Sequence, residues 1–559
     1  MRNPGKSDSG DTWLPGSSGP CWFLDVPTET LSNARTRPYS PALVTAVIVD
    51  GRSLTLDAVR AVALDRAPVE VHPEARARML RARAVVDEKA RGTAPVYGVN
   101  TGFGLLADKK IPPESLEKLQ VNLLRSHAAG VGDPLPATMV RAVMVLRANV
   151  LATGHAGTRP EVLDYLVAML NHEVHPVVPR QGSVGASGDL APLSHLALVL
   201  IGEGRAQVRG RELPGLLALR MAGLEPLKLA AKEGLSLVNG TQVMTGIGAL
   251  ALISAERLAR AADIAGALTV EALKGTPRAF DARLTAVRTH PGGIVCNANI
   301  ARLLADSEIA KSHSDIDDRV QDPYSLRCMP AVHGAVRDAH VHIRQVLETE
   351  INACTDNPLV YVEGDGISNV SELLSGGNFH GQPASVALDY LGLATASLGA
   401  ISERRTEQMV NPRESRLPAF LTDDPGLKSG FMMAHVTAAA LVSENKIHAH
   451  PASVDTIPTS GGQEDHVSMG VTAALKADQI VRNVARVLAI ELLAGARGVE
   501  FHQPLAPGKG VATAHAALRK LFPATDEDRP LGGDIDRLAG LILDGWLENE
   551  LKAGGFDLR

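Results

Sequence analysis

The feature that most limits the fold of this chain is a set of long stretches, all beyond about residue 230, in which apolar side chains recur with a helical period. In the clearest stretch, one face carries Ala477, Val481, Val484, Leu488 and Leu492, and the other carries Lys476, Gln479, Arg482, Asn483 and Arg486. This pattern predicts a long buried helix that ends near Gly495. Comparable helices are expected over residues 243–264, 331–350, 384–405 and 430–449. No fixed repeat length relates them, so we predict a helical bundle and not a solenoid.

The preceding part of the chain is mixed in character. Short β-rich runs, "TAVIVDG" (45–51) and "APVYGVN" (94–100), alternate with helical patterns such as residues 74–91, which Gly92 ends as a C-cap. Residues 1–42 are polar and rich in Gly, Pro and Ser, which is typical of a disordered tail. We therefore expect a mainly α fold in three parts: the tail, a smaller mixed α/β domain over 43–230, and a helical bundle with a C-terminal helical region over 231–559.

Charge and cysteine content restrict the class of protein. The net charge is -6, with acidic and basic residues spread along the chain, so we expect no nucleic-acid or membrane partner. The four cysteines are far apart, which favours reduced thiols in the cytoplasm. The first residues lack the apolar core of a signal peptide, and no stretch reaches the roughly 18 uninterrupted apolar residues of a membrane span. A soluble enzyme acting on a small molecule is the natural expectation.

Four polar segments interrupt the apolar patterns: "YGVNTGFG" (97–104), "GSVGASGDLAPLSH" (182–195), "VQDPYSLRC" (320–328) and "SGGQEDHVSM" (460–469). The first lacks the glycine spacing of phosphate-binding loops, so we expect no nucleotide. Histidines 448, 450 and 466 show no helical ligand spacing, so we expect no metal. No G-x-S-x-G motif supports a hydrolase, although Ser187 lies in a glycine-flanked turn.

The triplet Ala186-Ser187-Gly188 has a chemical use beyond a turn. If the Gly188 nitrogen attacked the Ala186 carbonyl with loss of one water, and the Ser187 side chain lost a second water, the backbone would close into a five-membered ring with an exocyclic methylidene. Such a ring is a strong electrophile. Glycine at 188 suits it, because a Cβ atom would hinder so close a backbone approach. On its own, however, the triplet also fits an ordinary loop.

The segments around this triplet extend the pattern along most of the chain. Residues 182–195 resemble the signature of the ammonia-lyases and aminomutases that carry a methylidene-imidazolone (MIO) group. The resemblance continues through "YGVNTGFG", "SHAAGVGDPLP" (126–136), "KEGLSLVNGTQ" (232–242), "VQDPYSLRC", "TDNPL" (355–359), "SGGNFHGQP" (375–383), "SERR" (402–405), "LVSENK" (441–446), "QEDHVSM" (463–469) and "DEDRPL" (526–531). In order and spacing these segments are similar to the histidine ammonia-lyases over about residues 45–545.

This resemblance implies a reaction and a set of residues. The reaction is removal of ammonia from L-histidine to give trans-urocanate, the first step of histidine degradation. The MIO group would link Ala186 to Gly188 as a 5-imidazolinone, with Ser187 as 2,3-didehydroalanine, and would need no metal or nucleotide. Tyr97 matches the general base, and Arg327 matches the anchor of the substrate carboxylate. Asn239, Tyr324 and Gln321 match residues near the ring and the substrate.

The remaining matches concern substrate choice and assembly. Glu464 matches the acid that binds the imidazole in histidine enzymes, His127 fits histidine and tyrosine members, and Phe379 is expected either to line the pocket or to belong to the core. Long one-sided helices and only 3% aromatic residues favour an oligomer, which the resemblance implies is a homotetramer with active sites shared between subunits.

Departures from the family pattern leave alternatives open. Met329 and Ala331 replace glutamines, His435 replaces a glutamine, and Gly461-Gly462 replaces a bulkier pair. The alternatives are a tyrosine or phenylalanine ammonia-lyase, or an amino acid 2,3-aminomutase, on the same scaffold. A protein that kept the fold and lost catalysis is a further alternative, although neither Ser187 nor Tyr97 is missing.

Overall fold

The protein is described by a computed structural model over residues 45–313, 319–524 and 527–559. The predicted tail, residues 1–42, lies outside the described residues, as does Cys21. Residues 45–559 form one compact unit. The predicted boundary at residue 230 therefore lies inside this unit, and it stays a prediction.

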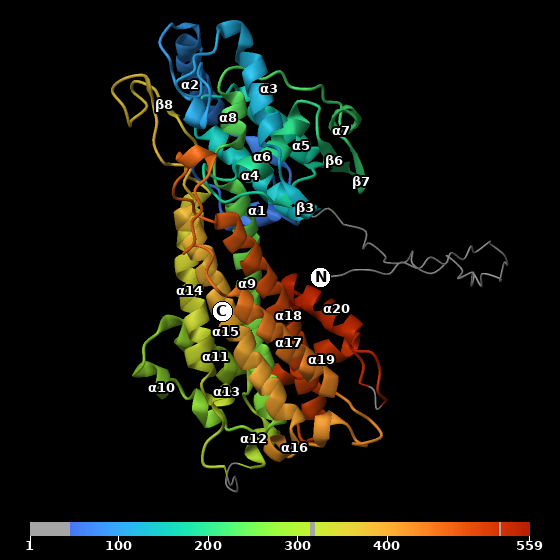
Figure 1. Cartoon of the computed structure of the whole chain (residues 1–559). Helices are drawn as coiled ribbons and strands as arrows, with labels where there is room; N and C mark the ends of the chain where they lie inside the picture. The colour runs from blue at the N-terminus through green and yellow to red at the C-terminus, as the bar shows by residue number, and fades with distance from the viewer. Residues whose placement is uncertain (1–44, 314–318, 525–526) are drawn as a thin grey trace, which may run out of the picture. The chain divides into compact units, whose positions relative to one another are not determined.

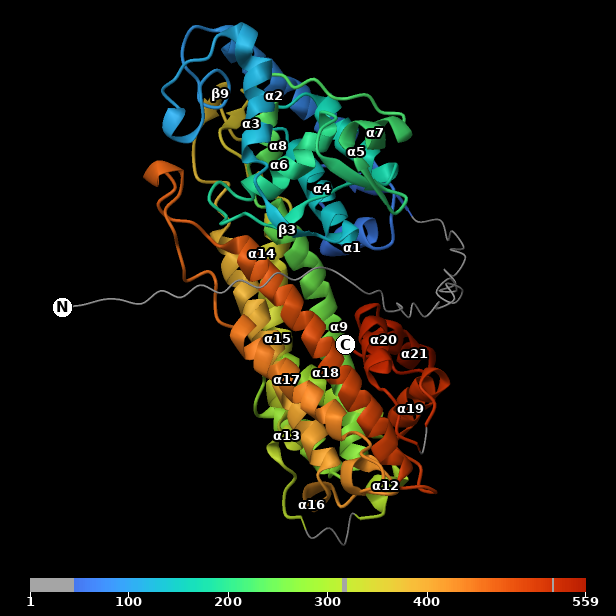
Figure 2. The ribbon, with the colours of Figure 1, turned by 45° about the vertical axis from the view of Figure 1, so that its right-hand side comes forward.

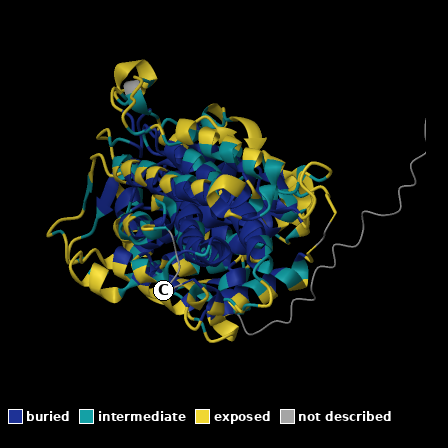
Figure 3. Cartoon of the chain, turned by 90° about the horizontal axis from the view of Figure 1, so that it is seen from below, coloured by how far each residue is buried: buried dark blue, intermediate teal, exposed yellow. Residues whose placement is uncertain are grey.

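Five long helices form the centre of the molecule (Figures 1 and 2). They are α9 (Gln242–Ala272), α14 (Met329–Glu350), α15 (Gln382–Val410), α17 (Met432–His448) and α18 (Gly470–Glu500). Helix α18 packs along α15, α9 and α17. Viewed from below, buried residues gather at the centre and exposed residues form the rim (Figure 3). The predicted bundle is confirmed, and each predicted long helix is present with somewhat different ends.

The helix predicted to end near Gly495 continues for five more residues, to Glu500. Gly495 does not end the helix because it lies at a close helix contact: a Cβ atom added there would lie 3.0 Å from the Cβ of Leu268 on α9. Val499, one turn further on, is still buried. Close packing, and not helix termination, accounts for this glycine.

The first part of the compact unit surrounds the upper end of α9 in Figure 1. Its helices are α1 (Leu56–Ala63), α2 (Pro73–Arg91), α3 (Leu116–His127), α4 (Ala137–Ala152), α5 (Pro160–Asn171), α6 (Leu190–Leu200), α7 (Gly215–Met221) and α8 (Glu233–Val238). Its strands are β1 (Val47–Val49), β2 (Val69–Val71), β3 (Val131–Pro134), β4 (Val174–Pro176), β5 (Pro179–Gln181), β6 (Arg205–Val208) and β7 (Arg211–Pro214). The mixed α/β character is confirmed, as is the cap of α2 at Gly92.

The sheets in the described residues are small. Strands β1 and β2 pair in parallel, with Val47 opposite Val69, and β3 pairs with β5 antiparallel. Strands β4, β6 and β7 form an antiparallel sheet, and β8 (Leu359–Tyr361) pairs with β9 (Glu372–Leu374). The strand expected over residues 94–100 is wrong. Asn100 donates to the carbonyl of Ala94 and accepts from the amide of Val96, and these local bonds fold the segment into a turn.

Shorter helices complete the fold: α10 (Ala282–Ala286), α11 (Pro291–Leu303), α12 (Glu308–Lys311), α13 (Tyr324–Arg327), α16 (Pro412–Ser415), α19 (Lys509–Leu521), α20 (Gly532–Leu543) and α21 (Trp546–Ala553). Helix α15 alone among the described helices has the length and composition to cross a membrane, and 61% of its apolar window is buried inside the protein. Because it packs against α14, α17 and α18, we interpret it as a core helix of the bundle.

Candidate active site

A cavity of about 770 Å³ collects the segments that the sequence singles out. Seven of the predicted residues line it, from segments far apart in the chain: Tyr97, His127, Ala186, Ser187, Asn239, Phe379 and Glu464. The structure thus brings together most of the predicted site within one chain. Phe379 lies in the cavity wall.

The triplet adopts a backbone conformation that only glycine tolerates at its third position. Gly188 has a φ of +76°, and a Cβ atom added there would lie 2.2 Å from the carbonyl oxygen of Gly240. The amide of Gly240 donates to the carbonyl of Ser187 at 3.2 Å, and the amide of Asp189 donates to the carbonyl of Gly240 at 2.7 Å. The turn is therefore tight and has no side chain at residue 188, and its two backbone hydrogen bonds with Gly240 hold it in place. These properties fit a triplet that closes into a ring.

Asp189 connects this turn to the first turn of α9. Its carboxylate oxygen Oδ2 accepts hydrogen bonds from the amides of Val243 and Met244, at 2.8 and 2.9 Å. Burial raises the pKa of Asp189 to about 7, although these hydrogen bonds oppose the shift. A helix N-terminus favours a nearby carboxylate, so this contact fixes the turn against the bundle.

Glu464 lies directly beside the triplet in the cavity wall. Its oxygen Oε1 accepts a hydrogen bond from the hydroxyl of Ser187 at 3.1 Å. Its other oxygen, Oε2, accepts from the hydroxyls of Thr459 at 2.6 Å and Ser460 at 2.7 Å. Two donors fix the carboxylate, while Oε1 faces the Ser187 hydroxyl of the triplet.

Two titratable residues that line the cavity, Tyr97 and His127, have shifted pKa values. Burial raises the pKa of the Tyr97 phenol, and the negative charges of Glu464 and Asp356 add to this increase. Burial lowers the pKa of His127. The Nδ1 atom of His127 lies 2.9 Å from the carbonyl of Leu123, which can only accept, so Nδ1 carries the hydrogen. No described residue hydrogen-bonds to Nε2, so a neutral His127 offers Nε2 as an acceptor.

The cavity wall also contains two histidines that the sequence did not predict as site residues, of which His466 was considered only as a metal ligand. The rings of His380 and His466 stack in the wall, with centroids 5.9 Å apart and planes 3° apart. His380 follows Phe379 directly, and His466 lies two residues after Glu464. Their proximity in the chain to predicted site residues was the available signal.

Three predicted residues lie outside this cavity. Tyr324 and Arg327 belong to α13, which lies far down the bundle from α8 in Figures 1 and 2. Tyr324 is 72% exposed, and the Arg327 guanidinium lies 4.6 Å from the centre of its ring. Gln321 is exposed in the preceding loop. One chain therefore does not bring these three residues to the Ser187 cavity.

The positions that depart from the family pattern lie in several parts of the structure. Gly461 and Gly462 lie in the loop that carries Ser460 and Gln463 into the cavity wall. Met329 is buried in the bundle, and His435 contacts the Glu403 carboxylate at 2.9 Å. Although burial opposes it, the hydrogen bonds from His435 and Arg404 lower the pKa of Glu403 to about 2.

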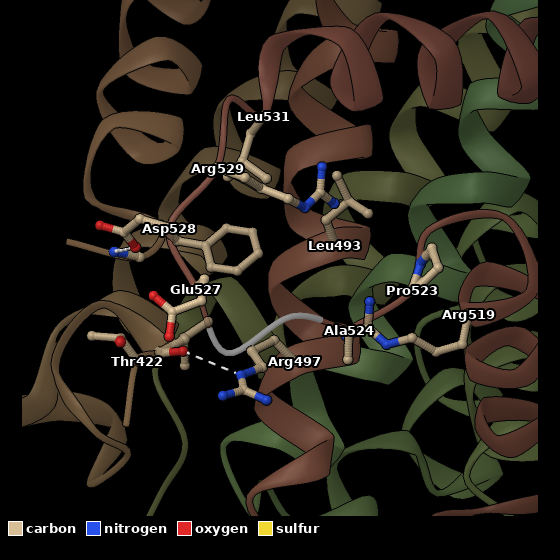
Figure 4. A pocket seen from close by; sticks show the side chains of 13 residues that line it. Thr422, Leu493, Arg497, Arg519, Pro523, Ala524, Glu527, Asp528, Arg529 and Leu531 are labelled. Atoms are coloured by element: carbon tan, nitrogen blue, oxygen red, sulfur yellow. Dashed lines mark hydrogen bonds between the residues drawn. The ribbon is translucent and has the colours of Figure 1, made fainter. Parts of the chain in front are cut away.

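Ala331 lines a different cavity of about 350 Å³, which Arg327 also borders. A third pocket lies where α18 meets the 523–531 segment (Figure 4). It is only about 70 Å³ in volume, too small for an amino acid. Its guanidinium groups already have carboxylate partners, since Arg519 and Arg497 pair with Glu500, and Arg529 pairs with Asp534.

One buried cluster has the composition of a metal site, formed by Asp263, Cys296 and His333. The Cys296 thiol donates to Asp263 at 3.2 Å, and Arg337 donates to the same carboxylate. Burial raises the pKa of the Cys296 thiol well above its usual range. A metal requires the thiolate, so a protonated thiol beside an arginine-neutralised carboxylate fits a structural hydrogen-bond network better.

Comparisons with known proteins agree with this geometry. The family profile described as aromatic amino acid lyase matches residues 54–520. The histidine ammonia-lyase of Anaeromyxobacter sp. (strain K) is 55% identical over 510 residues, covering 90% of this chain and 99% of that protein.

Solved structures are similar as well. The histidine ammonia-lyase of Trypanosoma cruzi superposes with a TM-score of 0.84 at 43% identity, covering 91% of this chain and 96% of that one. The tyrosine aminomutase of Streptomyces globisporus superposes with a TM-score of 0.85 at 38% identity, covering 91% and 99%. The match to the profile extends over most of the chain, and the chain belongs to the aromatic amino acid lyase family.

Proposed function

We propose that the chain catalyses the non-oxidative deamination of L-histidine to trans-urocanate and ammonia, the first step of histidine degradation. The observation that carries this proposal is the Glu464 carboxylate, fixed by Thr459 and Ser460 inside the cavity that contains Ser187. The half-buried Glu464 carboxylate can accept a hydrogen bond from an imidazole N–H through Oε1, whereas a phenyl ring has no hydrogen to donate to it. The histidine ammonia-lyases at about half identity agree with this choice.

The Ala186-Ser187-Gly188 turn fits the MIO group that this family implies, because residue 188 has no room for a side chain. Ala186 and Gly188 would be joined as the 5-imidazolinone, and Ser187 would become 2,3-didehydroalanine. When formed, the group would supply an electrophile for the substrate amine. Asn239, in the same cavity wall, would contact this group or the substrate. No metal or nucleotide enters the proposal.

Tyr97 is the proposed base that removes the β-proton. A base must be ionised, and the free phenol has a pKa of about 10. Burial and the charges of Glu464 and Asp356 raise the pKa of Tyr97 further within one chain. A positive charge is therefore needed to favour the phenolate.

The described lining of the cavity contains no lysine or arginine. We infer that a second copy supplies the missing charge through Arg327, with Tyr324 and Gln321 from the same segment. The Arg327 guanidinium would hold the substrate carboxylate as a bidentate pair. This inference agrees with the exposure of α13 and with the 770 Å³ cavity, which is large for one histidine.

A homotetramer is the proposed assembly. Apolar side chains on the outer face of α17 are exposed in one chain, among them Met433 at 63% and Ile447 at 71%. Exposed apolar faces of this kind are typical of subunit interfaces. We propose a cytoplasmic enzyme whose partner is the small-molecule substrate, and no nucleic acid or membrane. The three described cysteines form no disulfide, which agrees with this compartment.

Tyrosine is the second candidate substrate. A neutral His127 presents Nε2 as an acceptor, and the hydroxyl of a tyrosine ring could donate to it. The structural similarity to a tyrosine aminomutase favours this alternative over phenylalanine.

The test is to incubate the purified oligomer, without added metal, with L-histidine, L-tyrosine and L-phenylalanine in parallel. We expect urocanate and an equal amount of ammonia from L-histidine. Ammonia from tyrosine or phenylalanine alone would overturn the substrate, and a β-amino acid without ammonia would show an aminomutase.

A further inference from the structure

Lys232 is a fully buried lysine next to the active site that has no role in the reaction proposed above. It precedes α8 in a left-handed conformation with a φ of +70°. Its ammonium group donates to the Ala156 carbonyl at 2.8 Å, the Ser236 hydroxyl at 2.8 Å and Asp356 Oδ2 at 2.9 Å. All three donors of the ammonium group are thus used, and the side chain is held in one position.

Asp356 is buried beside it and uses both carboxylate oxygens. Oδ2 faces Lys232, and the Ser236 hydroxyl lies 3.0 Å from it. Oδ1 accepts from the Asn239 side-chain amide at 3.2 Å and from the backbone amide of Asn357 at 2.7 Å. One oxygen is therefore bound to the lysine, and the other faces a residue that lines the cavity.

These contacts determine the orientation of the side-chain amide of Asn239, the residue that follows α8. Its Nδ2 donates to Asp356 Oδ1 and to the carbonyl of Asn357 at 3.1 Å, so both amide hydrogens are used. An ionised carboxylate and a carbonyl only accept, so a flipped amide would place three oxygens together. In the described part of the chain, the Asn239 oxygen has no donor of its own and remains available to the cavity.

We propose that Lys232 and Asp356 are positioning residues, which fix the Asn239 amide with its oxygen toward the substrate. The substrate class this selects is an amino acid whose amino N–H donates to that oxygen. A buried ion pair is weak support for stability, since an apolar pair of similar size can be as stable. Here, the contacts of the Lys232–Asp356 ion pair lead instead to the side-chain amide of Asn239, which lines the cavity. This inference rests on the proposed function.

The experiment is a double-mutant cycle in the full-length protein, with Asp356→Asn, Asn239→Ala and the combination of both. In the wild-type background, Asp356→Asn should lower kcat/KM for L-histidine roughly 10- to 100-fold, because a charged hydrogen-bond partner is lost. In the Asn239→Ala background it should cost less than about threefold, because the positioned group is already absent. The intact mass should still show the loss of two water molecules, since the triplet is unchanged.

Glu233→Gln is the matched control. Glu233 is a fully buried carboxylate on the same helix that pairs with Arg159 and does not contact Asn239. Its effect on kcat/KM should be the same factor in both backgrounds. If Asp356→Asn fails to fold, Ser236→Ala replaces it, because it removes one hydroxyl near Asp356 and should give a smaller loss that also vanishes without Asn239.

An equal loss in both backgrounds for Asp356→Asn or Ser236→Ala would overturn the proposal. Imidazole propionate, a substrate analogue without the amino group, tests the contact between the Asn239 oxygen and that amino group. Its inhibition constant should be unchanged by Asp356→Asn, and weaker inhibition would overturn the proposed orientation of the Asn239 amide. Activity of the wild type toward L-histidine is measured first. Its absence would contradict the proposed function, whereas additive losses in an active enzyme contradict only the positioning role.

Discussion

The hydroxyl oxygen of Ser187 lies 3.1 Å from Oε1 of Glu464, although 277 positions separate the two residues in the chain. The residue proposed to become the electrophile and the residue proposed to select the substrate are therefore in direct contact in the cavity wall. Nothing fits between the two groups at this distance, so a substrate would contact both only by displacing this hydrogen bond. Each group gives its own prediction.

Replacing Ser187 by alanine should remove the electrophile and leave the fold intact. We expect ammonia release from L-histidine to fall roughly a thousandfold or more, because covalent catalysis is lost. Intact mass spectrometry should find the wild type lighter than its sequence by two water molecules and the variant without this loss. Ser375→Ala, at another serine of the cavity wall, should keep the mass loss. A Ser187→Ala variant with normal turnover would refute the assigned chemistry.

Gly188→Ala should block ring formation through geometry. The substitution places a side chain at positive φ and against the Gly240 carbonyl, so we expect a loss of more than about 2 kcal/mol in unfolding free energy. Gly210→Ala separates the two causes, because Gly210 has a φ of +75° and open space around it. That control should lose about 1 kcal/mol and keep the two-water mass loss. Denaturant unfolding and intact mass measure both effects.

Glu464→Gln should affect histidine turnover far more than folding. A neutral amide cannot replace the charged acceptor for an imidazole N–H, so we expect kcat/KM to fall roughly 10- to 100-fold. Asp465→Asn, at the neighbouring carboxylate of the cavity wall, should have little effect. Unchanged histidine kinetics in Glu464→Gln would exclude Glu464 from the substrate site.

Two inactive variants should restore activity when they assemble together. An Arg327→Ala chain keeps the triplet, and a Ser187→Ala chain keeps the α13 arginine, so a mixed oligomer contains some complete sites. Co-expression with two different affinity tags isolates the mixed oligomers, whose deamination rate is compared with that of each variant alone. Mixed oligomers without activity would contradict a site shared between subunits.

Acid should destabilise the fold partly through His340. Its side chain is 4% exposed, and burial, with the nearby arginines 337, 260 and 344, lowers its pKa to about 3. Below pH 6.5 the unfolded chain binds a proton that the folded chain does not, so the free energy of unfolding falls with pH between about 6.5 and 3. At pH 5.5 this loss is about 1.4 kcal/mol.

His340→Gln should therefore lose less stability than the wild type between pH 7.5 and 5.5, as measured by denaturant unfolding. His342→Gln, at an exposed position on the same helix, is the control and should keep the wild-type difference. An identical pH dependence in His340→Gln would show that this histidine is not the group that binds the proton on unfolding.

The sequence predicted the bundle well because long apolar periods leave few alternatives, and Gly92 ended its helix as a C-cap. The same reasoning was wrong at residues 94–100, where the Asn100 side chain satisfies the backbone locally. At Gly495 it mistook a glycine required by the contact with Leu268 for a helix end. In both places, contacts that a periodic pattern does not contain decided the outcome.

For the site, motif resemblance identified residues that the structure gathers around one cavity. It did not predict the Lys232–Asp356 pair, although both residues lie in segments that were singled out. The partners are 124 positions apart, and one sequence carries no sign of which buried lysine meets which carboxylate. The separation of α13 from the cavity likewise became visible only in three dimensions.

The long apolar helix α15 has a consequence for the synthesis of the chain. Its main partner, α18, ends 90 residues further along, so the ribosome needs roughly 5 to 20 s to complete it. During this interval the nascent chain presents a helix whose largest packing surface has not yet been made. Folding of the bundle therefore has to wait for translation, and in that time α15 is the kind of segment that chaperones with apolar binding sites hold.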